Sequence, residues 1–141
     1  MFRDCRIQIN IHRFYTTGVG KNSYVIYEVE ISLVESESKF QVSRRYRQFR
    51  DLHTLMCSRY GSAVQFLQFP SRKLFGSKTE AVSSERQRDL QTYLNRLVSV
   101  CCKLPGSPLY TAQTREALET FSAFFQKETE DTEPTALLRT L

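Results

Sequence analysis

Hydrophobic and polar residues alternate along the first third of the chain with the two-residue period of a β-strand. Residues 6–14 place three isoleucines on one face: Ile7, Ile9 and Ile11. A second alternating stretch covers residues 25–33, and a third follows an acidic turn, with apolar positions at Phe40 and Val42. Three consecutive strands joined by turns predict an antiparallel β-meander.

The hydrophobic period becomes helical after the third strand. Apolar residues recur at helical spacing from Phe49 to Tyr60, before Gly61. Further helices are predicted over residues 84–100, capped by Ser83 or Ser84, and over residues 114–125. The pattern predicts an α+β fold in which the meander packs against a helical subdomain of three to four helices.

A long connection, residues 62–83, separates the first two predicted helices and contains Pro70 and Gly76. Structureless connections of this length are uncommon in compact domains and often carry function. Residues 127–141 combine acidic residues with Pro134 and predict a frayed or disordered tail. The expected organisation is one domain over residues 1–126, followed by this tail.

Composition narrows the class of partner. The 141 residues include 20 Lys plus Arg against 15 Asp plus Glu, a net charge of +5 that favours nucleic acid or an acidic membrane surface. The four cysteines show no Cys-x-x-Cys spacing, which indicates neither a zinc site nor a disulfide framework. No apolar run approaches the roughly 20 residues that span a bilayer. A cytoplasmic domain is expected.

The densest basic cluster, residues 44–50, lies where the third strand gives way to the first helix. Arginines at a strand end are ordinarily a solvated edge that discourages aggregation. A helix amino terminus, however, offers free N–H groups, and arginine forks match phosphate oxygens. The cluster alone leaves both interpretations open.

Three motifs resemble those of PX (phox-homology) domains, the phosphoinositide-binding modules of sorting nexins. Arg-Arg-Tyr-Arg-Gln-Phe, residues 44–49, resembles the signature R-[RK]-[FY]-x-x-[FY]. Residues 69–76 are similar to the family's ΨPxxK loop, and residues 85–94 resemble its arginine-bearing helix. The resemblance covers about residues 5–125 and implies a membrane-targeting module, with no enzymatic activity, cofactor or metal.

The resemblance implies four headgroup contacts. Arg45 would grip a 3-phosphate, Tyr46 would stack under the inositol ring, and Lys73 would contact the 1-phosphate. Arg86 would hydrogen-bond the 4- and 5-hydroxyls and leave little room for phosphates there. The expected ligand is therefore phosphatidylinositol 3-phosphate, and the expected location is the surface of early endosomes. Arg44 in this family more often supports the fold.

Each assignment has an alternative. Tyr46 also fits a core aromatic paired with Phe49 at i+3, and Arg86 competes with Arg88.

The loop contributes a second predicted feature. Leu74 and Phe75 are flanked by Arg72, Lys73 and Lys78, a pattern that suits insertion among anionic headgroups. The alternatives are that Phe75 folds back onto the core, that Lys73 is an ordinary exposed lysine, and that Arg72 takes its role.

Other functions find less support. Gly18 to Lys21 lacks the first glycine and the Ser or Thr of a phosphate-binding P-loop, and His12 and His53 have no clustered ligands. A nucleic-acid-binding sheet would carry aromatic and basic residues where these strands carry Ile, Val and Glu. A protein-interaction role for a PX fold stays open, with the helical face near residues 121–125 as its candidate surface.

Overall fold

The computed structural model describes residues 5–72 and 78–127 and contains one three-stranded antiparallel sheet. Its strands are β1 (Ile7–Thr17), β2 (Tyr24–Leu33) and β3 (Ser38–Arg45), in the order β1-β2-β3. Ile7, Ile9 and Ile11 are all buried, and the register shifts between Ile11 and Arg13. The predicted meander is confirmed, and β1 extends beyond its expected end at residue 14.

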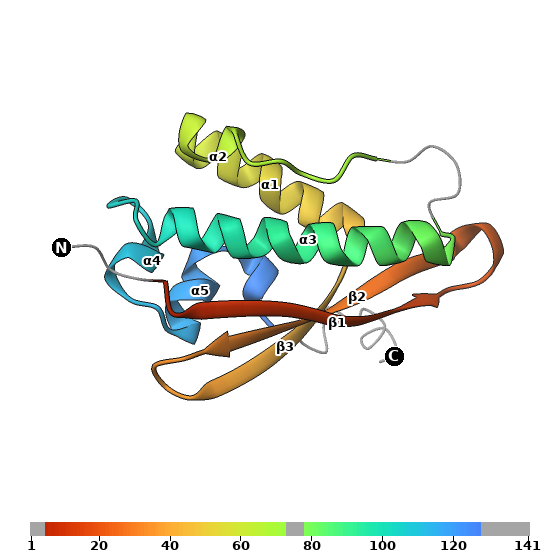
Figure 1. Cartoon of the computed structure of the whole chain (residues 1–141), viewed down its shortest axis with the longest axis horizontal. Helices are drawn as coiled ribbons and strands as arrows, with labels where there is room; N and C mark the ends of the chain where they lie inside the picture. The colour runs from red at the N-terminus through yellow and green to blue at the C-terminus, as the bar shows by residue number, and fades with distance from the viewer. Residues whose placement is uncertain (1–4, 73–77, 128–141) are drawn as a thin grey trace, which may run out of the picture.

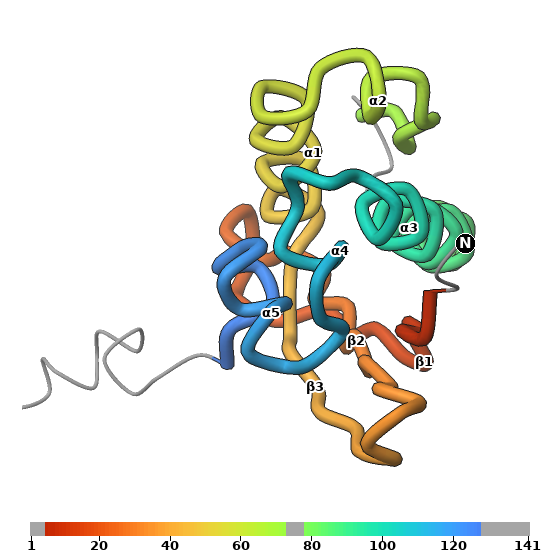
Figure 2. Tube along the Cα trace, turned by 90° about the vertical axis from the view of Figure 1, so that its left-hand side faces the viewer, coloured from red at the N-terminus to blue at the C-terminus, as the bar shows by residue number. Residues whose placement is uncertain are grey.

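The helices lie on one side of the sheet, and α3 runs along β1 (Figures 1 and 2). The α-helices of the described residues are α1 (Tyr46–Tyr60), α2 (Ser62–Gln65), α3 (Glu80–Cys101), α4 (Pro108–Thr111) and α5 (Arg115–Phe121). Two short 3₁₀ helices accompany them, η1 (Gly20–Asn22) and η2 (Ala123–Phe125). This arrangement is the predicted α+β fold. The short helices α2 and α4 were not predicted, because helices of one turn are too short to show a helical period of hydrophobic residues.

Two predicted helix boundaries were also wrong. Helix α3 begins at Glu80, because Thr79 Oγ1 accepts a hydrogen bond from the Val82 N–H at 3.3 Å, whereas Ser83 is buried within the helix. The predicted helix over residues 114–125 ends early, because Ser122 is extended. The Ser122 side chain then accepts the Phe124 N–H at 3.0 Å and starts η2.

Side chains of α3 complete the outer edge of β1. Asn95 Oδ1 accepts from the Ile9 N–H at 3.0 Å, and Asn95 Nδ2 donates to the Ile9 carbonyl at 2.8 Å. One turn and two turns earlier, Gln91 accepts from the Ile11 N–H and Gln87 donates to the Ile11 carbonyl, each at 2.7 Å. These bonds satisfy backbone groups that a strand edge leaves unpaired, and they fix the rotation of α3 relative to the sheet.

The core extends through the C-terminal segment. Phe121 and Phe125 are fully buried, and Phe124 is 7% exposed. The face near residues 121–125 is therefore interior and is not the partner surface suggested as an alternative. None of the described helices combines the length and the apolar character required to cross a bilayer. Of the predicted tail, all but Lys127 lies outside the described residues.

Candidate functional site

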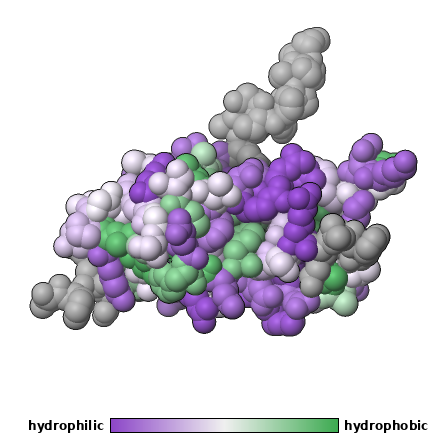
Figure 3. Space-filling view, turned by 90° about the horizontal axis from the view of Figure 1, so that it is seen from above, coloured by the Kyte–Doolittle hydropathy of each residue, from purple (hydrophilic) through white to green (hydrophobic). Residues whose placement is uncertain are grey.

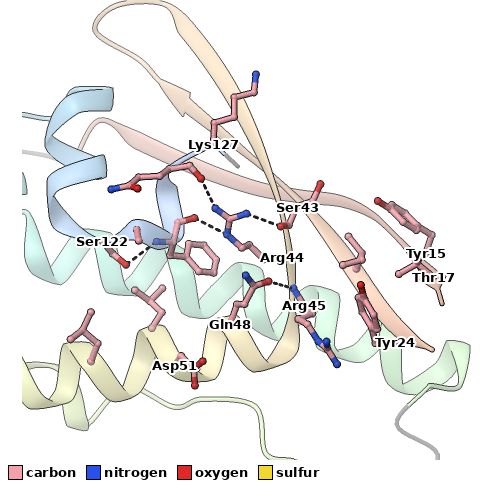
Figure 4. Close-up of a pocket in the computed structure, with 16 residues that line it drawn as sticks. Tyr15, Thr17, Tyr24, Ser43, Arg44, Arg45, Gln48, Asp51, Ser122 and Lys127 are labelled. Carbon is pink, nitrogen blue, oxygen red and sulfur yellow. Dashed lines mark hydrogen bonds between the residues drawn. The ribbon is translucent and has the colours of Figure 1, made fainter. Parts of the chain in front are cut away.

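The site is built on the junction between β3 and α1, where two consecutive arginines take opposite directions. Arg45 ends β3 and precedes α1 with an extended backbone, and its N–H donates to Gln48 Oε1 at 2.9 Å. Side chains alternate between the faces of a strand, so Arg44 enters the core and Arg45 does not. In Figure 4, Arg44 points toward the C-terminal segment and Arg45 points away from it.

Arg44 is a structural residue. It is 3% exposed, and its guanidinium donates to three backbone carbonyls, at 2.9 Å to Phe124, at 2.8 Å to Ser43 and at 2.5 Å to Gln126. These bonds tie the end of the fold to β3, as expected of an arginine that supports the fold.

A cationic cavity of about 290 Å³ lies beside the junction. Among the described residues its lining includes six cationic side chains and no carboxylate, and the cations are Arg45, Arg47, Arg50, Arg72, Lys78 and Arg86. In the view from above, hydrophilic residues form a strongly coloured zone right of centre (Figure 3). Like charges gathered without a counter-ion favour an anionic ligand.

Tyr46 forms part of the cavity wall. Its hydroxyl donates to the Pro70 carbonyl at 2.6 Å, and its ring lies 5.7 Å from that of Phe69. The structure gives no ring contact between Tyr46 and Phe49, although both residues are described, so the alternative of an i+3 aromatic pair does not hold. Burial raises the pKa of the Tyr46 phenol, and the nearby charge of Arg86 opposes that rise.

Arg86 is the most unusual cation in the cavity. Its side chain is 7% exposed, and its guanidinium carbon lies 3.9 Å from the centre of the Tyr46 ring. Among the described residues, its buried Nε has no partner at hydrogen-bonding distance, and the same is true of the buried hydroxyls of Tyr27 and Ser83. Burial raises the pKa of the Tyr27 phenol, and Ser83 and Arg86, which lie close to its hydroxyl, oppose that rise. Buried polar groups ordinarily have partners. A buried guanidinium that faces a cavity without a carboxylate is poised for an anionic or hydroxyl-bearing ligand.

The sequence predictions can now be placed. Arg45, Tyr46 and Arg86 meet in one cavity, whereas Arg88 is exposed and does not line it. Lys73, Leu74 and Phe75 lie outside the described residues. Arg72, the residue before Lys73, does line the cavity.

Several lining residues had not been assigned a headgroup contact from the sequence, among them Tyr24, Arg50 and Lys78, and of these only Lys78 had been given another role, as a cation beside the insertion pair. Arg50 follows Tyr46 by four residues, and this spacing places both on one helix face. Lys78 donates to Ser23 Oγ at 3.1 Å and thus links the long connection to the turn between β1 and β2. That link is tertiary and leaves no periodic signal in the sequence.

A second and larger cavity, about 900 Å³, opens on the other side of Arg45 and is bounded by α1, the sheet and the C-terminal segment (Figure 4). Tyr24 and Arg45 line both cavities. Across the described part of the chain, no three His, Cys, Asp or Glu side chains come together as a metal site would require.

Comparison with known proteins places the chain in a family. Residues 32–111 match the family model of the PX domain. The kinesin-like protein Klp98A of Drosophila melanogaster is 42% identical over 124 residues, and human kinesin-like protein KIF16B is 34% identical over 126 residues. These alignments cover 84% and 86% of this chain but only 10% and 9% of the two relatives.

Among solved structures, a designed CISK-PX domain superposes with a TM-score of 0.58 at 22% identity. The match covers 82% of this chain and 98% of the designed domain. At this level of identity the similarity concerns the fold, and it agrees with the three-stranded sheet and helices described above.

Proposed function

Because the chain belongs to the PX domain family of phosphoinositide-binding, membrane-targeting modules, we propose that its cationic cavity binds the headgroup of phosphatidylinositol 3-phosphate. In this proposal Arg45 binds the 3-phosphate and Tyr46 lies under the inositol ring. Lys73 contacts the 1-phosphate, and the domain recruits the protein that contains it to endosomal membranes.

The observation that carries the proposal is the buried Nε of Arg86, which has no hydrogen-bond partner among the described residues and lies in a cavity whose described charged lining residues are all cations. Hydrogen bonds from an arginine to hydroxyls at positions 4 and 5 would satisfy this group. A phosphate at either position would have to fit beside a side chain that is held against Tyr46 and is 7% exposed. This steric argument favours a headgroup that is free at both positions.

Attachment to the membrane requires more than the headgroup, since a single weak anchor gives only marginal and reversible binding. We assign the second contribution to Leu74 and Phe75, which would enter the lipid surface. The two cations on either side, Arg72 and Lys78, are both exposed and would meet anionic headgroups.

The test is sedimentation with phosphatidylcholine vesicles that carry one phosphoinositide isomer at a time. The wild-type domain is expected to prefer phosphatidylinositol 3-phosphate. Arg45→Ala should weaken this binding by ~10- to 150-fold, the factor that corresponds to the free energy of a hydrogen bond to a charged group. Arg88→Ala is the matched control, because Arg88 is an exposed arginine outside the cavity. Equal binding of wild type and Arg45→Ala would disprove the site.

The insertion assignment needs a separate measurement. Phe75→Ala should weaken binding to vesicles while leaving the affinity for soluble inositol 1,3-bisphosphate unchanged, because a soluble headgroup offers no lipid surface. A parallel loss of both affinities would instead place Phe75 in the headgroup site or the core.

A further inference from the structure

The Arg45 side chain lies against an aromatic ring on the neighbouring strand. The guanidinium carbon of Arg45 lies 3.9 Å from the centre of the Tyr24 ring, within the range of a cation–π contact (Figure 4). Tyr24 begins β2 and Arg45 ends β3. The two residues are therefore brought together by strand pairing and not by proximity in the sequence.

The register of the sheet explains the contact. Arg45 pairs with Ile26, and Tyr24 lies two residues before Ile26 on the same strand face. Because β3 ends at Arg45, the paired positions of β2 and β3 stop at Ile26, and no β3 residue stands beside Tyr24. The Arg45 side chain lies diagonally across this position, at the separation that long side chains span between strands.

No other described group competes for the Arg45 side chain. Within residues 5–72 and 78–127, its guanidinium forms neither an ion pair nor a hydrogen bond. Arginine has several rotatable bonds, and ordering them at the moment of binding weakens affinity. A ring that already holds the guanidinium removes part of this entropic cost and leaves all of its N–H donors available.

We infer that Tyr24 is a positioning residue that holds the Arg45 guanidinium at the wall between the two cavities, ready for the phosphate of the headgroup. The inference rests on the proposed function and extends it to a residue outside the three resembling motifs. It is specific to the aromatic face, because the Tyr24 hydroxyl makes no hydrogen bond to the described residues.

The experiment compares two substitutions at one position with a control nearby. Tyr24→Phe keeps the ring, and Tyr24→Leu keeps only an apolar side chain. Tyr15→Leu is the control, because Tyr15 has its own cation–π contact, 5.2 Å from Arg13, and lines only the larger cavity. Binding is measured with soluble inositol 1,3-bisphosphate and with phosphatidylinositol 3-phosphate vesicles.

Tyr24→Leu is expected to bind ~2- to 30-fold more weakly, the factor that corresponds to one cation–π contact. Tyr24→Phe and Tyr15→Leu should stay within about twofold of wild type. Wild-type affinity in Tyr24→Leu, or an equal loss in Tyr24→Phe, would overturn the inference.

A ligand-free measurement separates this inference from the proposed function. The Arg45 Nε–H resonance should show an upfield ring-current shift in wild type and Tyr24→Phe that disappears in Tyr24→Leu. Its absence from wild type would overturn the positioning role whatever the domain binds. Its presence in a domain that binds no phosphoinositide would support the contact and overturn the proposed function.

Discussion

Arg86 provides the sharpest test of the idea that the cavity is maintained for a ligand at the expense of stability. We expect Arg86→Met to abolish most headgroup binding while leaving the fold about as stable as before, or more stable. Methionine replaces the long side chain with one of similar reach and no charge, so the packing near Tyr46 is largely kept.

The expected change in the free energy of unfolding follows from two opposing contributions of the Arg86 side chain. Its buried Nε has no hydrogen-bond partner in the part of the chain that the structure describes, and an unsatisfied buried donor costs about 1–3 kcal/mol. Its cation–π contact with the Tyr46 ring, whose centre lies 3.9 Å from the guanidinium carbon, stabilises the folded state by about 0.5–2 kcal/mol. Removing both should change the free energy of unfolding by between a loss of about 1 kcal/mol and a gain of about 2.5 kcal/mol. Affinity should fall by ~10- to 150-fold.

Urea unfolding followed by far-ultraviolet circular dichroism gives the stability, since the chain contains no tryptophan to report by fluorescence. Calorimetric titration with inositol 1,3-bisphosphate gives the affinity. Arg88→Met, at an exposed position of α3, should alter neither quantity. If Arg86→Met lost more than about 2 kcal/mol of stability, Arg86 would be a structural arginine and the reasoning would be refuted.

Two further predictions concern groups outside the headgroup contacts. Arg44→Ala should lower the free energy of unfolding by about 2–4 kcal/mol, because the carbonyls of Phe124 and Gln126 lose a buried donor. In urea unfolding this loss should appear without any change in phosphoinositide preference, and a change in preference would contradict the structural role. The second concerns Cys5, whose pKa is lowered to about 7, chiefly by the hydrogen bond with Cys102. Alkylation of Cys5 by iodoacetamide, followed by mass spectrometry, should rise through pH about 7 as the thiolate forms, and Cys102→Ala should move this rise to higher pH. An unmoved profile would exclude Cys102 as the cause.

The sequence predicted the structure best in elements whose hydrophobic residues follow a single regular period, either that of a strand or that of a helix. The alternation of isoleucines in β1 predicted their burial because the strand has a single core face. Arg86 was preferred over Arg88 by its spacing from Leu90 and Tyr93, and both of these residues are buried with it. Helical periodicity thus placed Arg86 on the buried face of α3, where it lines the cationic cavity.

The start of α3 could not be predicted in the same way. Thr79, Ser83 and Ser84 are all good capping residues, and intrinsic preference hardly separates them. Tertiary packing decides, since Ser83 is buried inside the helix while Thr79 remains exposed and caps it. Tyr24 was missed for a related reason, because its contact with Arg45 depends on sheet register.

The pair of arginines at the junction shows how the fold and the site depend on each other. Strand geometry sends Arg44 inward to carbonyls at the end of the fold and sends Arg45 outward to the ring of Tyr24. The hydrogen bonds of Arg44 hold the C-terminal end of β3 in place. The position of this strand end determines where the Arg45 guanidinium can reach. An insertion of one residue within β3, just before Arg44, would exchange the faces of the two arginines. The same change would bury Arg45 and expose Arg44, so we expect the domain to lose stability and the proposed headgroup binding together.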